Sequence, residues 1–196
     1  MSDQETIRVY DNKIDDYLGM VDDHGPDAVL SSFMSKVTPG GFVLDLGCGP
    51  AHSSSVMRAN GFLVDPVDAS EGMVKIANEK FDINARVAVF EDINSTAEYD
   101  GIWANFSLLH AAADDLPDII KALHKAMKAG GVFHLGMKIG SGASRDKFGR
   151  LYTYYSQQQL CDYLLAAGFT IDEIETTEGT GLAGELESWI SICSIA

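Results

Sequence analysis

The spacing of hydrophobic residues along the chain alternates between the pattern of a helix and the pattern of a strand. Residues 6–20 place apolar side chains at helical spacing, among them Ile7, Tyr10 and Ile14, which predicts an amphipathic helix. Residues 42–46 instead form a short and almost continuous apolar run, the pattern of a strand that is buried on both faces of a sheet. The chain therefore changes from helical to strand periodicity well before its middle.

Strand and helix patterns then alternate to the end of the chain. Strands are expected at residues 42–46, 62–67, 86–90, 101–105, 132–138, 170–176 and 188–195. Helices are expected at residues 6–20, 27–37, 51–60, 70–80, 116–129 and 156–167. Gly130 and Gly131 should end the fifth of these helices and Gly168 the last, because glycine supplies left-handed backbone.

This order of elements predicts an α/β fold, a three-layer αβα sandwich around a doubly wound, mostly parallel, seven-stranded sheet. No repeat, linker or low-complexity stretch divides the sequence. We therefore expect one domain over residues 1–196.

Composition and charge restrict the partners. The chain is 46 % hydrophobic and 22 % charged, which is typical of a globular protein. Its 14 Lys and Arg face 29 acids, a net charge of −15, so too few cations are present to neutralise nucleic-acid phosphates. We expect a small-molecule substrate, no nucleic-acid partner and no membrane partner, while the oligomeric state stays open.

The cellular compartment is predicted from segments that the sequence lacks. No run approaches the ~20 apolar residues of a membrane span, and the acidic N-terminus has no hydrophobic signal core. Three cysteines without a CxxC pair predict neither a disulfide framework nor a metal site. A reducing cytoplasm is the expected location.

A glycine turn follows the first predicted strand. Gly47 and Gly49 would let backbone approach a ligand without an intervening Cβ, at the strand ends where open α/β sheets bind ligands. Asp68 closes the second strand, at the distance from the turn at which an acid binds ribose hydroxyls in dinucleotide sites. The dinucleotide fingerprint itself is G-x-G-x-x-G, and His52 stands where its third glycine belongs. NAD binding is therefore the weaker interpretation.

Together these residues resemble class I methyltransferases that use S-adenosylmethionine (SAM). Residues 43–50, Val-Leu-Asp-Leu-Gly-Cys-Gly-Pro, are similar to the first motif of that family, with Ala51 in place of the usual glycine. Residues 67–73 are similar to the second motif, and residues 99–104 and 108–110 to later ones. Lys138 and the segment 140–155 resemble a small bacterial branch of uncharacterised or tellurite-resistance-like enzymes.

The resemblance implies a cofactor site and a Rossmann-like methyltransferase fold. SAM would be the cofactor and S-adenosylhomocysteine its product. The first two helices, within residues 1–38, would form a lid over the site. The residues implied to bind the cofactor are Tyr10, Tyr17, Asp45, Gly47, Cys48, Gly49, Asp68, Ala69, Met73, Phe90, Asp92, Asn105 and Phe106.

The acceptor side of the site is predicted less directly. Asn105 would face the reacting centre, and His110 is the candidate general base because its pKa lies near neutrality; a structural histidine is the alternative. A second group could bind an anionic acceptor, or could form internal salt bridges instead. This group comprises Lys138, Arg145, Arg150, Tyr152 and Tyr154.

We therefore expect methyl transfer from SAM to a small-molecule acceptor, with an anionic acceptor as one option. Two alternatives remain at this point: a SAM-binding protein without transferase activity, and an NAD(P)-dependent oxidoreductase.

Overall fold

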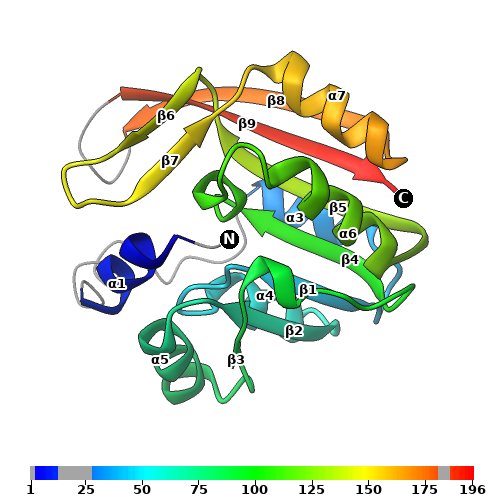
Figure 1. The fold of residues 1–196 in the computed structure, drawn as a ribbon. Coiled ribbons are helices and arrows are strands. Elements are labelled where there is room, and N and C mark those ends of the chain that lie inside the picture. The colour runs from blue at the N-terminus through cyan, green and yellow to red at the C-terminus, as the bar shows by residue number, and fades with distance from the viewer. Residues whose placement is uncertain (1–2, 13–27, 181–185) are drawn as a thin grey trace.

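The computed structural model describes residues 3–12, 28–180 and 186–196, and its centre is a seven-stranded sheet (Figure 1). Its strands are β1 (Phe42–Leu46), β2 (Leu63–Asp68), β3 (Arg86–Val87), β4 (Tyr99–Asn105), β5 (Met127–Lys138), β8 (Thr170–Thr180) and β9 (Leu186–Ile195). The described helices are α1 (Gln4–Asn12), α3 (Ala28–Lys36), α4 (His52–Ala59), α5 (Glu71–Phe81), α6 (Leu116–Ala126) and α7 (Gln157–Ala167). A separate hairpin consists of β6 (Gly142–Arg145) and β7 (Leu151–Tyr154), and two 3₁₀ helices are η1 (Phe90–Asp92) and η2 (Leu108–His110).

The strand order is β3-β2-β1-β4-β5-β9-β8. The first five strands pair in parallel, whereas β9 is antiparallel to both β5 and β8. The predicted doubly wound, mostly parallel sheet is thus confirmed. The order reverses between β1 and β4, and at such a reversal the crossovers leave to opposite faces and open a crevice beyond the carboxyl ends of the strands.

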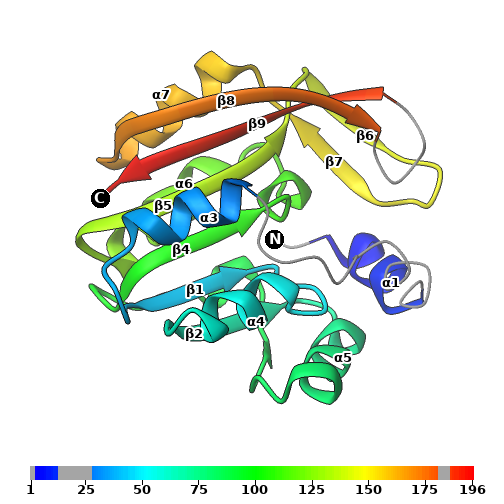
Figure 2. The same ribbon diagram turned by 180° about the vertical axis from the view of Figure 1, so that it is seen from behind.

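Helices cover both faces of the sheet (Figures 1 and 2). On one face α6 packs against β5, and α7 packs against α6 and β8, with Leu116, Leu123 and Leu164 fully buried. Each such leucine contributes about 1.5–3 kcal/mol by leaving water. On the other face α3 and α4 cover β1 and β4, where Trp103 stacks on His134 with ring centroids 3.9 Å apart. His134 is thus buried within the sheet.

Several predicted boundaries were wrong, among them the start of β5, which begins at Met127 instead of residue 132. The strand expected over residues 86–90 ends at Val87, because the carboxylate of Asp92 accepts the Val89 N–H and begins the short helix η1. The helix expected over residues 116–129 ends at Ala126, where β5 begins. Gly130 has the expected positive φ of 78°, but it lies within β5, where its N–H donates to the Ala196 carbonyl.

The segment after Lys138, for which no strand was expected, contains the β6–β7 hairpin. By contrast, the predicted end of α7 is confirmed, since Gly168 follows it with φ 107°. Of the helix expected over residues 6–20, α1 accounts for the part up to Asn12, and the remainder lies outside the described residues. None of the described helices has the length and apolarity needed to cross a membrane.

Candidate functional site

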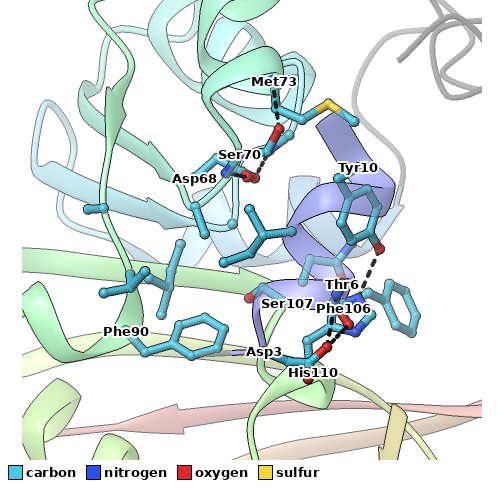
Figure 3. Close-up of a pocket in the computed structure, with 18 residues that line it drawn as sticks. Asp3, Thr6, Tyr10, Asp68, Ser70, Met73, Phe90, Phe106, Ser107 and His110 are labelled. Atoms are coloured by element: carbon cyan, nitrogen blue, oxygen red, sulfur yellow. Dashed lines mark hydrogen bonds between the residues drawn. The ribbon is translucent and has the colours of Figure 1, made fainter. Parts of the chain in front are cut away.

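A cleft opens at the carboxyl ends of β1, β2 and β4 and is bordered on its outer side by α1 (Figure 3). Its empty space is about 750 Å³, a figure that includes space open to solvent. The predicted site residues that line it are Tyr10, Gly47, Gly49, Asp68, Ala69, Met73, Phe90, Asn105, Phe106 and His110. Tyr17 lies outside the described residues.

The glycine turn forms one wall of the cleft. Gly47 has φ 76° and Gly49 has φ 53°, a region that side chains rarely adopt. The Gly47 and Cys48 N–H groups both donate to the Val67 carbonyl, at 2.8 and 2.9 Å. A Cβ added to Gly47 would lie 2.4 Å from the Cβ of Ser107. The turn after β1 therefore lies so close to the segment after β4 that only glycine fits.

The carboxylate of Asp68 holds this turn in place. Its Oδ2 accepts the Gly49 N–H at 2.8 Å, and its Oδ1 accepts the Ser70 N–H at 2.9 Å. Removal from water raises the pKa of this carboxyl. A carboxylate offers about four lone-pair positions, so two remain for a ligand in the cleft.

Asp45 lies behind the turn and is not one of the lining residues in the described chain. It is 2 % exposed, and Ser54 Oγ of α4 donates to its Oδ2 at 2.6 Å. Burial raises the pKa of Asp45 to about 7. In this structure Asp45 joins β1 to α4, and its predicted contact with the cofactor stays a prediction.

Three residues at β2, α5 and η1 line the side of the cleft away from β4. These are Ala69, Met73 and Phe90. Asp92 is exposed and its carboxylate accepts the Val89 N–H, while the half-buried Cys48 also falls outside the described lining. The structure thus brings Phe90 to the cleft and leaves Asp92 at its edge.

Asn105 and Phe106 form the opposite end. Asn105 Oδ1 accepts a hydrogen bond from His134 Nε2 at 3.1 Å, which orients the amide. Phe106 has φ 56°, which costs a bulky residue about 1–2 kcal/mol. Its N–H donates to the Gly136 carbonyl, and its ring meets Trp189 edge to face with centroids 5.7 Å apart. Both side chains are therefore held in position.

The hydrogen bonds of His110 show which of its ring nitrogens carries the proton. Nδ1 lies 2.6 Å from the Leu151 carbonyl, which can only accept, so Nδ1 carries the proton. Nε2 then accepts from the Tyr10 hydroxyl at 2.9 Å. Removal from water lowers the pKa of His110 to about 4, and the nearby charges of Arg150 and Lys138 lower it further. The imidazole is neutral at pH 7.

Helix α1 is bound to both sides of the cleft. On one side Leu151 N–H donates to Thr6 Oγ1 at 2.8 Å, beside the Tyr10–His110 contact. On the other side Ser70 Oγ donates to Asp11 Oδ1 at 2.6 Å, at the start of α5. These contacts place α1 across the cleft, where the sequence predicted a lid.

The three predicted acceptor-binding cations are paired with protein carboxylates. Lys138 Nζ lies 2.7 Å from Glu187, Arg145 forms a two-pronged contact with Asp3, and Arg150 donates to Asp146 at 2.7 and 2.9 Å. The Nζ of Lys138 lies over the ring of Tyr152, 3.8 Å from the ring centroid. The rings of Tyr152 and Tyr154 are stacked, with their centroids 6.3 Å apart. None of these five residues is among the described lining residues.

Sequence reasoning missed several lining residues. Asp3 caps α1 by accepting both the N–H and the hydroxyl of Thr6, and Ser70 caps α5 by accepting the Met73 N–H. Both are helix N-cap patterns that could have been recognised. Ser107 carried no sequence signal, because its position depends on the turn at Phe106. Within the described ranges, no cluster of three or more His, Cys, Asp or Glu side chains could hold a metal ion.

His110 makes the stability of the protein pH-dependent. Its folded pKa of about 4 lies below the ordinary 6.5, so its contribution is complete above pH 6.5 and is lost as the pH falls toward 4. Between pH 7.5 and 5 the wild type should lose roughly 1–2 kcal/mol more than His110→Gln. Urea unfolding of both proteins at each pH measures this, and parallel pH curves would contradict it.

A family model and two curated relatives each match less than half of this chain in sequence. Residues 43–131 match the family model of a methyltransferase domain. An uncharacterised methyltransferase of Staphylococcus carnosus is 29 % identical over 86 residues, 44 % of this chain and 42 % of that protein. A malonyl-(acyl-carrier protein) O-methyltransferase of Enterobacter lignolyticus is 34 % identical over 92 residues, 46 % of this chain and 36 % of that protein. The matched stretch thus spans less than half the length of these two relatives.

The fold is also found among solved structures. The 1,6-didemethyltoxoflavin-N1-methyltransferase of Burkholderia thailandensis, solved with S-adenosylhomocysteine, superimposes with a TM-score of 0.75. The two are 18 % identical, and the match covers 96 % of this chain and 87 % of that one. The fold is therefore the Rossmann-like methyltransferase fold, and SAM is the cofactor that these matches support.

Proposed function

We propose that the protein transfers a methyl group from SAM to a small-molecule acceptor. The observation that carries this proposal is the cleft at the strand-order reversal, where the glycine turn and Asp68 lie side by side within the matched domain. The comparisons favour neither of the two alternatives, the SAM-binding protein without activity and the NAD(P)-dependent enzyme.

The residues present fit the cofactor. Gly47 offers backbone without a Cβ, and Asp68 retains lone pairs for ribose hydroxyls. Phe90 and Met73 would pack on the adenine. The cofactor would then extend past Gly47 toward Asn105 and the acceptor, beneath α1.

Methyl transfer demands chiefly orientation from this chain. SAM supplies the methyl group on a positively charged sulfur, and an in-line approach of the acceptor can contribute about 7–11 kcal/mol through positioning alone. Asn105, Phe106 and α1 would hold the acceptor and exclude water. His110 is neutral at pH 7 and its Nε2 accepts from the Tyr10 hydroxyl, so it would act as a general base through that hydroxyl if the acceptor must lose a proton.

The acceptor itself is proposed to be small and uncharged. Among the described residues that line the cleft none is Lys or Arg, and the nearby cations are neutralised by Glu187, Asp3 and Asp146. An anionic acceptor would have to displace these carboxylates before it could pair with Lys138, Arg145 or Arg150. For this reason we do not retain the anionic acceptor that the sequence left open. We also do not propose that the protein belongs to the tellurite-resistance-like branch.

The cofactor site is tested by binding. Calorimetry should give S-adenosylhomocysteine a Kd of roughly micromolar strength and no measurable heat with NAD. Asp68→Asn should weaken S-adenosylhomocysteine about tenfold to a hundredfold, because hydrogen bonds to a charged group are lost. Asp118→Asn makes the same charge change on an exposed position of α6 and should leave binding unaltered. Absence of S-adenosylhomocysteine binding in the wild type would refute the proposed function.

The close approach at Gly47 is tested by a matched pair of alanines. Gly47 and Gly61 both have positive φ, but a Cβ at Gly61 meets nothing within 4 Å. Both substitutions should cost about 1–2 kcal/mol of folding stability through backbone strain, and Gly47→Ala should cost more because its Cβ would clash with the Cβ of Ser107. Only Gly47→Ala should also weaken S-adenosylhomocysteine, by roughly tenfold or more. Equal affinities of the two variants in calorimetry would show that the close approach is irrelevant to binding.

A further inference from the structure

The cleft contains a buried hydroxyl that no described residue satisfies. Ser107 is only 6 % exposed, and its Oγ has no hydrogen-bond partner among the described residues. Leaving a buried hydroxyl unpaired is destabilising, because the group loses its hydrogen bonds to water without gaining another. Ser107 is one of the residues that line the cleft, and Figure 3 places it among the side chains around its centre.

The position of Ser107 is set by strain in the preceding residue. Phe106 adopts φ 56° and donates its N–H to the Gly136 carbonyl, which turns the chain sharply after β4. The Ser107 carbonyl then accepts the His110 N–H and starts η2. As a result the Ser107 side chain faces the turn after β1, where a Cβ on Gly47 would lie 3.2 Å from its hydroxyl.

The strand order indicates which part of the cofactor reaches Ser107. The cleft crosses the ends of β2, β1 and β4 in that spatial order, with Asp68 after β2, Gly47 after β1 and Ser107 after β4. If the ribose is bound at Asp68, the adenine and the amino-acid portion must leave it in opposite directions. Phe90, beyond β2, borders the adenine side, so the amino-acid portion extends over Gly47 to Ser107.

We propose that Ser107 binds the amino-acid portion of SAM through its hydroxyl, a role that rests on the proposed function. A hydroxyl can donate to the carboxylate or accept from the ammonium of that portion, and both are charge-assisted bonds. Binding would satisfy the orphaned Oγ, which is buried against the glycine turn, once a rotation about the Cα–Cβ bond turns the hydroxyl toward the ligand. Ser107 is thus a positioning residue that fixes the distance between the sulfur and the acceptor end of the cleft.

Ser107→Ala tests this role, with Ser194→Ala as its matched control. Ser194 is also fully buried with an unpaired Oγ, but it pairs with Phe133 and Ile171 near the opposite edge of the sheet. Both substitutions remove an unsatisfied hydroxyl, so both should leave the melting temperature of the ligand-free protein unchanged or higher. Only Ser107→Ala should weaken S-adenosylhomocysteine, by about tenfold to a hundredfold in calorimetry.

The ligand identifies the contact. 5′-Methylthioadenosine lacks the amino-acid portion, so wild type and Ser107→Ala should bind it equally. Decarboxylated SAM retains the ammonium: a loss of affinity on Ser107→Ala assigns the contact to the ammonium, and equal binding assigns it to the carboxylate. If S-adenosylhomocysteine binds the wild type and Ser107→Ala equally, the inference is wrong although the proposed function stands. If the wild type binds no S-adenosylhomocysteine, the proposed function itself fails.

Discussion

The two oxygens of the Asp68 carboxylate connect the turn after β1 to the start of α5. One oxygen accepts the Gly49 N–H and the other the Ser70 N–H. Because β1 and β2 are neighbours in the sheet, this one side chain sets how far the glycine turn stands from the end of β2. Every other feature of the cleft is arranged around that distance, including the contact between Gly47 and Ser107 and the capping of α5.

Several residues around the cleft hold unfavourable conformations or burial. Ala51 has φ 62° and is fully buried, where the resembling family has glycine, and Phe106 has φ 56°. Each costs about 1–2 kcal/mol, and the raised pKa of Asp45 reports a further cost of burying a carboxyl beside the turn. Strain of this kind is concentrated at functional sites, because the surrounding fold must overdetermine the geometry. Here the strained residues flank the turns after β1 and β4.

The element boundaries that depend on local sequence pattern were predicted best. The apolar run at β1 is bounded by glycines on both sides, so both of its ends were predicted to the residue. The strand expected to reach Phe90 was wrong because a side chain, that of Asp92, competes for the Val89 N–H. The end of α6 was wrong because Met127 pairs with Tyr99 in the sheet, a contact that periodicity does not reveal.

The site was predictable where a motif carried it and not where distant segments meet. Gly47, Gly49 and Asp68 line the cleft as expected from their spacing. The carboxylate partners of Lys138 and Arg145 are 49 and 142 residues away, so no local pattern could separate ion pairing from acceptor binding. Ser107 depends on the backbone conformation of Phe106, which a sequence pattern cannot supply.

A crystal structure with S-adenosylhomocysteine tests the central claim most directly. The account predicts ribose hydroxyls on the Asp68 carboxylate, adenine against Phe90, and the amino-acid portion across Gly47 toward Ser107. A ligand bound with its ribose away from Asp68, or bound outside the cleft between α1 and the glycine turn, would contradict it.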